Sequence, residues 1–482
     1  MREPEIGPEP LAADVLRRDR RVQQAKDLLL AAWSEIRSLL NGPRPACPGR
    51  ATDYARAVEE LGRLRGRELF FPYLASGIGR GPLVELADGS VKYDMISGIG
   101  VHVLGHSHPA MLSACVDAAL EDTVVQGNLM QSRVVPAFLS RLLEAANRRG
   151  ARLSHGFPTT SGAMANENAL KIAFQKKHPA SRLLAFAGSF AGRSLALSQV
   201  TDRPEYRQGL PETVRVDRIP FYDPARPDEG TRAAASALSR HLARHPGEHA
   251  AMFFELVQGE GGFYPGSRVF FRALMEILKK RGVIVIVDEI QTFGRTTELF
   301  AYSHFGLDEY VDIVTLGKLS HVCATLFRAE LNPGPGLLSQ TFTSSTAAFH
   351  AAIAILAELT EGGYYGPDGK VARLGALFAE GLRAIERRHP DLLTGPYGTG
   401  AMIACTPLGG DAGRVKAFLQ KLYQAGVIAY SAGAPAGRVR FLPPFGCMDP
   451  DDVRAVLGIL ESTLVTVAGN NEAAAEEPHA EA

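Results

Sequence analysis

The sequence predicts an α/β protein in which a large domain with a mostly parallel β-sheet is followed by a smaller α+β domain. The first observation is that four short apolar runs, rich in Val, Ile or Phe, alternate with longer amphipathic stretches such as 161–177 and 267–281. The apolar runs are 182–187, 250–256, 282–289 and 311–316. Continuously apolar strands that alternate with helices are typical of a parallel sheet covered on both faces.

The second observation is a change of pattern after about residue 365. Helical runs at 370–388, 412–425 and 449–466 alternate there with the strand-like segments MIACTP (402–407) and RVRFLP (438–443). This mixture predicts a separate α+β unit at the end of the chain.

With 482 residues, the chain is long enough for two or three domains. Residues 11–40 look helical, and the Gly- and Pro-containing segment that follows them ends the helix. The final segment, GNNEAAAEEPHAEA, has few apolar residues to anchor it. We therefore expect a helical extension at 1–68, a large domain at 69–362, a small domain at 363–468 and a disordered tail at 469–482.

The composition is that of an ordinary globular protein. Basic and acidic residues number 52 each, so the formal net charge is zero and no surface for nucleic acid or membrane is expected. The N-terminus lacks the pattern of a signal peptide, and we expect no membrane-spanning segment. Five scattered cysteines without a CxxC pair indicate neither a zinc site nor a disulfide framework, so we expect a cytoplasmic protein.

Two polar side chains follow neighbouring apolar runs. Asp288 and Glu289 come directly after one run, and Lys318 comes just after the next. Ligands of such sheets bind beyond the carboxyl ends of the strands. Acids in this position often only cap the next helix, and a single lysine is usually a surface residue. A carboxylate and a lysine together are what pyridoxal phosphate requires, because the lysine forms a Schiff base and the carboxylate keeps the pyridine nitrogen protonated.

A Thr/Ser/Gly turn opens the helix expected at 161–177. The free N–H groups and the dipole at such a helix start form an anion site. Many helices begin in this way, so the turn becomes a candidate phosphate site because of Lys318.

Seven motifs in the same order give the chain a resemblance to the class III aminotransferases, a family with fold type I that contains the ornithine, acetylornithine, 4-aminobutyrate and lysine 6-aminotransferases. The resemblance runs from about Phe70 to about Val467. The motifs are PLVELADGSVKYDMISGIGVHVLGHSHP, TSGAMANENALK, FAGR, ELVQGEGG, VDEIQT, LGK and RVRFLPP.

For the cofactor, the resemblance implies that Lys318 carries pyridoxal 5'-phosphate covalently and then moves protons, and that Asp288 holds the pyridinium proton. It also implies that Gln291 bonds the phenolic oxygen of the ring, that Phe190 stacks on the ring, and that Glu255 lies beside it. The residues matching the phosphate site are Ser161, Gly162 and Ala163, with Thr341 supplied by the partner subunit of a homodimer.

For the substrates, the resemblance implies that Arg440 binds the α-carboxylate, since a guanidinium is well shaped for it. Glu260 matches the glutamate that covers this arginine when no second carboxylate needs it. The alternatives are a surface ion pair for Arg440 and a solvated loop acid for Glu260. His106 and His108 are expected to stabilise their loop.

Several positions depart from the family pattern. Met164 stands where Glu is usual, Ala191 stands where His or Trp is common, and 343–346 replaces Gly-Gly-Asn-Pro. The run VDEIQTFGRT is one glycine shorter than usual. The segment 319–323 is closer to the lysine 6-aminotransferases, and 122–132 is expected to line the entrance. These departures concern the substrate more than the cofactor.

The sequence as a whole predicts an aminotransferase that moves an amino group from an amine or ω-amino acid donor to an oxo acid, 2-oxoglutarate being the first choice. One alternative is another pyridoxal-phosphate reaction on the same scaffold, such as that of an aminomutase, epimerase or decarboxylase. The other is a relative without cofactor that serves as a scaffold.

Overall fold

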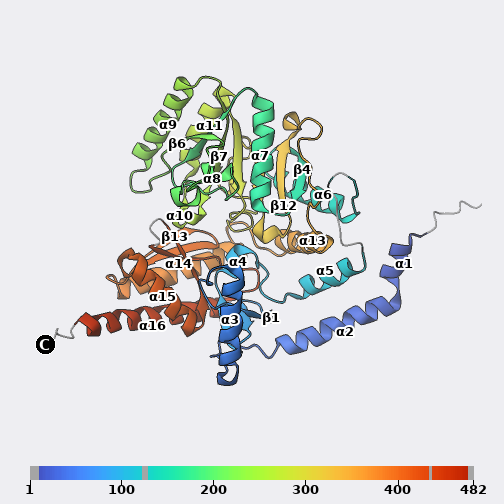
Figure 1. Ribbon diagram of the computed structural model, residues 1–482, viewed down its shortest axis with the longest axis vertical. Helices are drawn as coiled ribbons and strands as arrows, with labels where there is room; N and C mark the ends of the chain where they lie inside the picture. Colours follow the sequence, from blue (N-terminus) through green and yellow to red (C-terminus); the bar gives the residue numbers. More distant parts are fainter. Residues whose placement is uncertain (1–9, 122–126, 128, 434–436, 476–482) are drawn as a thin grey trace, which may run out of the picture.

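The structure is a computed structural model that describes residues 10–121, 127, 129–433 and 437–475, without the side chains of 470–475. A seven-stranded sheet forms the upper part of Figure 1, and the C-terminal helices lie below it. Two N-terminal helices, α1 (Ala12–Arg18) and α2 (Arg20–Arg37), run along the lower right, beside the body of the molecule. In the described part of the chain, no helix is long and apolar enough to cross a membrane.

The seven-stranded sheet has the order β4-β12-β11-β10-β7-β5-β6. All neighbouring pairs among the last five strands are parallel, whereas β12 is antiparallel to both of its neighbours. The strands are β4 (Leu153–Thr159), β5 (Arg182–Phe186), β6 (Arg215–Ile219), β7 (His249–Glu255), β10 (Ile284–Glu289), β11 (Ile313–Leu316) and β12 (Cys323–Arg328). The predicted mostly parallel sheet is confirmed, while β4, β6 and β12 were not identified from the sequence.

Helices cover both faces of this sheet, which explains why its strands are continuously apolar. Alternate residues of β10 pack into different cores: Ile284 and Ile286 face helix α7 (Gly162–Lys177), and Val285 and Val287 face the other side. The helices that pack around the sheet and next to it are α5 (Pro109–Ala119), α6 (Val134–Asn147), α9 (Pro227–Arg244), α11 (Arg268–Arg281) and α13 (Thr346–Glu361).

The C-terminal part contains a four-stranded antiparallel sheet in the order β13-β14-β17-β16. Its elements are α14 (Lys370–Arg388), β13 (Leu393–Thr399), β14 (Met402–Pro407), α15 (Ala412–Ala425), β16 (Tyr430–Ala432), β17 (Arg438–Phe441) and α16 (Pro450–Ala475). The predicted helices and strands of this α+β unit are all present. Helix α16 continues to Ala475, so the prediction of a disordered tail is wrong for residues 469–475; residues 476–482 lie outside the described residues.

The N-terminal segment joins this C-terminal unit and not the large sheet. Strands β1 (Ala75–Arg80), β2 (Leu83–Leu86) and β3 (Val91–Asp94) form a sheet with β15 (Val427–Ile428). Because β3 pairs with β15, residues 75–94 belong with the C-terminal unit, although we placed them in the large domain. Short-range patterns do not reveal a strand pair that is more than three hundred residues apart in sequence. Helix α3 (Ala51–Arg65) precedes this sheet.

Candidate active site

A cavity of about 300 Å³ lies at the carboxyl ends of β7, β10 and β11. The strand register places Asp288 of β10 beside Glu255 of β7 and beside Thr315 of β11, and Lys318 follows three residues after Thr315. Eight of the predicted site residues line the cavity. They are Gly162, Ala163, Phe190, Glu255, Glu260, Asp288, Gln291 and Lys318.

Lys318 lies in a tight turn directly after β11. Its φ is 50°, a left-handed conformation that a non-glycine residue seldom adopts. Burial lowers the pKa of Lys318 from 10.5 to about 8, and the charges of Arg440 and Arg295 act in the same direction, while those of Glu260 and Asp288 oppose it. A substantial fraction of the amine is therefore neutral near pH 8, as a nucleophile requires.

Asp288 is held in a fixed orientation by two donors. Its Oδ1 accepts a hydrogen bond from the backbone N–H of Ile290 at 2.8 Å, and its Oδ2 accepts one from Nδ2 of Asn166 at 2.8 Å. Burial raises the pKa of Asp288 to about 6 against these hydrogen bonds. A buried carboxylate of this kind is stabilised when a cation lies in front of it.

Helix α7 begins at the edge of the cavity. Ser161 is its N-cap, and its Oγ accepts a hydrogen bond from the N–H of Met164 at 3.2 Å. A Cβ atom on Gly162 would lie 2.9 Å from Cγ2 of Ile290, so the close approach of helix and strand end requires glycine. The first N–H groups of the helix are thus available to an anion.

Glu255 and Gln291 complete the wall of the cavity. The carboxylate of Glu255 accepts hydrogen bonds from the N–H of Phe190 at 2.9 Å and from the N–H of Gly259 at 3.0 Å. Burial, together with the charge of Asp288, raises the pKa of Glu255 to about 8. The Oε1 of Gln291 is buried and has no hydrogen-bond partner in the part of the chain that the structure describes. Such an atom is costly unless a ligand satisfies it.

Glu260 and Arg440 form an ion pair between the two domains. The Nη1 of Arg440 donates to Oε1 of Glu260 at 2.7 Å, and the arginine side chain is 1% exposed. Although burial alone would raise the pKa of Glu260, the charge of Arg440 lowers it. Neither alternative from the sequence applies, because the arginine is not a surface residue and the glutamate is not free in solvent.

Other predicted residues have structural roles. His106 contacts Oδ2 of Asp94 at 2.9 Å, and Nδ1 of His108 accepts from the N–H of Ala110 at the start of α5, so both stabilise their loop. Glu289 accepts hydrogen bonds from the N–H groups of Ala301 and Tyr302. For Asp288 and Glu289, at the end of β10, the sequence left helix capping open as an alternative role. That role applies to Glu289.

Thr341 does not reach the cavity of its own chain. It lies exposed in the loop before α13, where Ser345 caps the helix by accepting from the N–H of Ala348 at 3.2 Å. Of the departures from the family pattern, Ala191 lines the cavity and Met164 is 37% exposed. The predicted entrance segment 122–132 lies partly outside the described residues, which lack 122–126 and 128.

Two residues of the site were missed in the sequence. Asn166 holds Asp288, and its place four residues after Gly162 puts it on the same face of α7, which was a usable signal. Arg193 lines the cavity and lies over the ring of Tyr206, with 4.0 Å between its Cζ and the ring centroid. It belongs to the FAGR motif, but no role was assigned to it.

The residues fit pyridoxal phosphate on the evidence of the cavity itself. One space is surrounded by four features. They are the amine of Lys318 with its lowered pKa, the buried carboxylate of Asp288, the helix start at Gly162 and the unpaired amide oxygen of Gln291. The fold and this set of groups define an enzyme of the fold type I, pyridoxal-phosphate-dependent class.

Comparisons with known proteins define the family. The profile of the family "Aminotransferase class-III" matches residues 71–464. The acetylornithine aminotransferase of Bacillus subtilis is 32% identical over 389 residues, which are 78% of this chain and 91% of that protein. The acetylornithine aminotransferase of Corynebacterium efficiens is 34% identical over 319 residues, which are 64% of this chain and 74% of that protein.

Solved structures show the same fold. The lysine aminotransferase of M. tuberculosis has a TM-score of 0.75 at 23% identity, over 85% of this chain and 99% of that one. The ornithine aminotransferase of Toxoplasma gondii has a TM-score of 0.74 at 23% identity, over 86% of this chain and 95% of that one. The chain belongs to the class III aminotransferase family. It is a transaminase that depends on pyridoxal phosphate.

Proposed function

We propose that the enzyme transfers an amino group from an amine or ω-amino acid donor to 2-oxoglutarate, and that Lys318 and Asp288 are its catalytic residues. The observation that carries this proposal is the Glu260–Arg440 pair, because one buried arginine with a removable carboxylate can serve two substrates. While Glu260 covers Arg440, the site accepts the amine end of a donor. When the pair opens, Arg440 binds the carboxylate of the oxo acid.

When bound, the cofactor supplies an aldehyde for covalent attachment and a protonated ring that withdraws electrons. Lys318 would hold it through Nζ, Asp288 would face the ring nitrogen, and Gln291 would bind the phenolic oxygen through its side-chain amide. Phe190 would stack on the ring, and Glu255 would fix the N–H groups of the loops beside it. The phosphate group would be bound by Ser161, Gly162 and Ala163.

The residues of this chain then divide the work. The neutral amine of Lys318, once free, takes the proton from the donor carbon that bears the amino group. Asp288 would hold the proton on the ring nitrogen of the cofactor, because the side chain of Asn166 and the N–H of Ile290 fix its two carboxylate oxygens. Arg193, a second cation at the cavity wall, is placed to bind another carboxylate, which suits a dicarboxylic oxo acid.

The exposed loop of Thr341 supports a homodimer in which this residue completes the phosphate site of the partner. The five cysteines are free thiols, which supports a reducing compartment such as the cytoplasm.

A panel of amine donors with 2-oxoglutarate, read by glutamate formation, tests the proposal. The expected result is glutamate with at least one donor, together with loss of the visible cofactor band when that donor is added alone. If donors are consumed without glutamate and the band persists, an aminomutase, epimerase or decarboxylase reaction takes the place of transamination. A preparation without any cofactor band would instead support a scaffold protein.

A further inference from the structure

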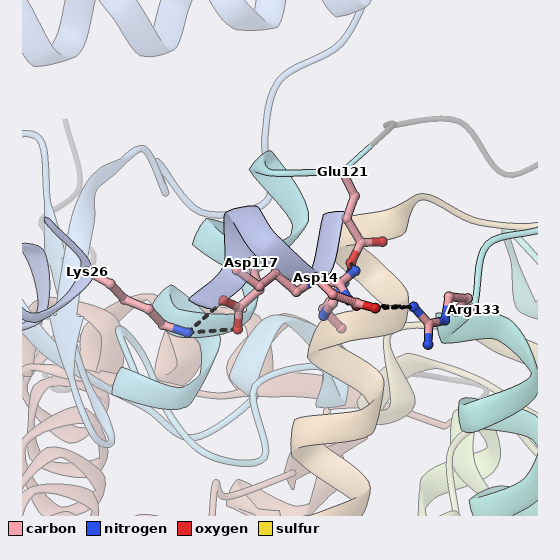
Figure 2. Close-up of polar contacts among 7 residues, drawn as sticks. Asp14, Lys26, Asp117, Glu121 and Arg133 are labelled. Carbon is pink, nitrogen blue, oxygen red and sulfur yellow. Dashed lines mark hydrogen bonds and ion pairs between the residues drawn. The ribbon is translucent and has the colours of Figure 1, made fainter. Parts of the chain in front are cut away.

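Helices α1 and α2 lie outside the part of the chain that matches the family, and ion pairs hold them against α5 and the start of α6. Figure 2 shows Lys26 of α2 reaching Asp117 of α5, at 2.7 Å, and Asp14 of α1 paired with Arg133, at 3.1 Å. Only Asp19 separates the two helices, and its side chain caps α2. The position of α1 is therefore set both by its own contacts and by those of α2.

A third contact of α1 is shared with α13. The Nη2 of Arg17 donates to Oε1 of Glu121, and Nε2 of His350 lies 3.1 Å from the same oxygen. Glu121 comes two residues after the end of α5, and His350 lies near the start of α13, so one carboxylate connects three helices. The side chain of Glu121 is only 13% exposed, a setting in which hydrogen bonds to a charged group stabilise more than at an open surface.

Arg17 determines which way this carboxylate faces. A guanidinium is planar and always charged, so it orients the carboxylate that it binds. In the described part of the chain, the carboxylate of Glu121 has no polar partners besides Arg17 and His350. Without Arg17, the side chain of Glu121 would gain rotamer freedom, and its hold on His350 would weaken.

The start of α13 carries the loop that contains Thr341. Thr343 and Ser344 are buried, so the loop is packed against the protein just before the helix, while Thr341 is exposed. His350 lies about one helical turn after Thr346, the first residue of α13. A displacement of the first turns of α13 therefore moves Thr341 as well.

We propose that Arg17 is a positioning residue that fixes the start of α13 through Glu121 and His350, and thereby holds Thr341 in place at the partner's cofactor phosphate. The N-terminal helices of one subunit then strengthen cofactor binding in the other. This inference rests on the proposed function, in which Thr341 completes the phosphate site of the partner. Such a contact tolerates only small displacements, because a hydrogen bond weakens steeply with distance and angle.

Cofactor titration of the full-length enzyme tests the inference without any substrate. The cofactor-free protein is titrated with pyridoxal phosphate, and the visible band of the attached cofactor gives the dissociation constant. Arg17→Ala should raise this constant about fivefold, which corresponds to about 1 kcal/mol. Arg18→Ala, the same change at an exposed arginine of α1, is the matched control and should stay within about twofold of the wild type.

Two substitutions of His350 separate its hydrogen bond from its packing. His350→Ala should weaken cofactor binding about as much as Arg17→Ala, since both release the same carboxylate. In His350→Gln the amide still donates to Glu121, so the dissociation constant should return to within about twofold of the wild type. Equal losses in both His350 variants would overturn the inference.

A double-mutant cycle shows whether Arg17 acts through Thr341. Thr341→Ala alone should raise the dissociation constant about tenfold, the scale of a lost hydrogen bond to a charged group. Adding Arg17→Ala to Thr341→Ala should raise it by less than about twofold more, because both substitutions act on the same contact. A further loss of about fivefold in this background would show that Arg17 only stabilises the fold, and the inference would be wrong.

Failure of the inference can be told from failure of the proposed function. If Thr341→Ala weakens cofactor binding and Arg17→Ala does not, the inference is wrong and the role of Thr341 stands. If Thr341→Ala binds the cofactor as the wild type does, the role proposed for Thr341 is wrong, and the inference fails with it. Amino transfer to 2-oxoglutarate is measured separately and is decided by neither result.

Discussion

The carboxylate of Glu260 lies 2.7 Å from Nη1 of Arg440, whose side chain is buried between the two domains. The two residues are 180 positions apart in the chain, so the contact exists only because β17 packs against the short helix α10 (Gly259–Gly262), which contains Glu260. A buried guanidinium that loses its carboxylate partner becomes a costly uncompensated charge. An acidic ligand that replaces Glu260 avoids this cost.

Replacing Glu260 with glutamine should therefore affect the two halves of the reaction differently. We expect the half-reaction with an amine donor to slow by about tenfold, because the uncovered Arg440 repels the donor's ammonium group; a loss of about 1.4 kcal/mol corresponds to this factor. The half-reaction with the oxo acid should change less than threefold. Single-turnover absorbance measurements separate the two halves.

Glu205→Gln, the same change at an exposed position, is the control and should alter neither half-reaction. If both half-reactions slow equally in Glu260→Gln, Glu260 does not act as a removable cover of Arg440.

Asn166 should set the acid limb of the pH profile. In Asn166→Ala, Asp288 loses the N–H donor at 2.8 Å that favours its charged form, so its pKa rises further above the value of about 6 that burial already gives it. Cofactor affinity and kcat/KM should then begin to fall at a higher pH on acidification than in the wild type.

Asp288→Asn should lower kcat by a hundredfold or more at every pH.

Asn168→Ala provides the comparison, because Asn168 is equally buried on the same helix and its contacts do not include Asp288 among the described residues. An unchanged acid limb in Asn166→Ala, or the same shift in Asn168→Ala, would show that the hydrogen bond does not control Asp288.

The sequence was sufficient to predict at which edge of the sheet the site lies. Asp288 and Lys318 each follow an apolar run, and parallel neighbours bring such positions together by their register. The sequence was not sufficient to predict contacts between segments that are far apart in the chain. Strand β12 enters the sheet antiparallel between β11 and β4, and β3 pairs with β15 across most of the chain; neither leaves a local signal.

The same limit applies within the site. Motif matching located Glu260 and Arg440, but only the structure shows the arginine buried and paired. Burial also produces the shifted pKa values of Glu255, Asp288 and Lys318, and burial is a property of the packed protein. Asn166 was missed because an asparagine inside a helix has no special meaning until the strand beside it is known.

Lys318→Ala distinguishes a cofactor lysine from a surface lysine. We expect the visible band of the attached cofactor to disappear, and borohydride should no longer fix the cofactor to the protein. Transamination should fall by about a thousandfold or more, since both the nucleophile and the proton carrier are removed. Lys171→Ala, an exposed lysine on α7, should leave the band and the rate unchanged. Retention of the band in Lys318→Ala would remove this residue from the cofactor site.

Asp217, on the edge strand β6, should make the stability of the protein depend on pH. Its two oxygens accept hydrogen bonds from Nε and Nη2 of Arg182, both at 2.8 Å, and one also contacts Nε2 of His249 at 2.8 Å. Burial alone would raise the pKa of Asp217, but these partners lower it below its ordinary value of 3.8. Because the folded-state pKa is the lower one, the stabilisation is fully present above about pH 3.8 and is lost as the pH falls below it.

Asp217→Asn should accordingly reduce the free energy of unfolding by about 2 kcal/mol at pH 7, the scale of hydrogen bonds to a charged group. The difference from the wild type should narrow below about pH 3.8 by at most about 1.4 kcal/mol for each pH unit, since the unfolded wild-type chain then binds a proton that the folded chain does not. Urea unfolding from pH 7 to pH 3 measures this difference, with the exposed Asp391→Asn as the control that should stay within 0.5 kcal/mol of the wild type, roughly the range for surface substitutions. A difference that remains constant over the whole range would show that Asp217 stabilises the fold through packing, without a contribution from its charge.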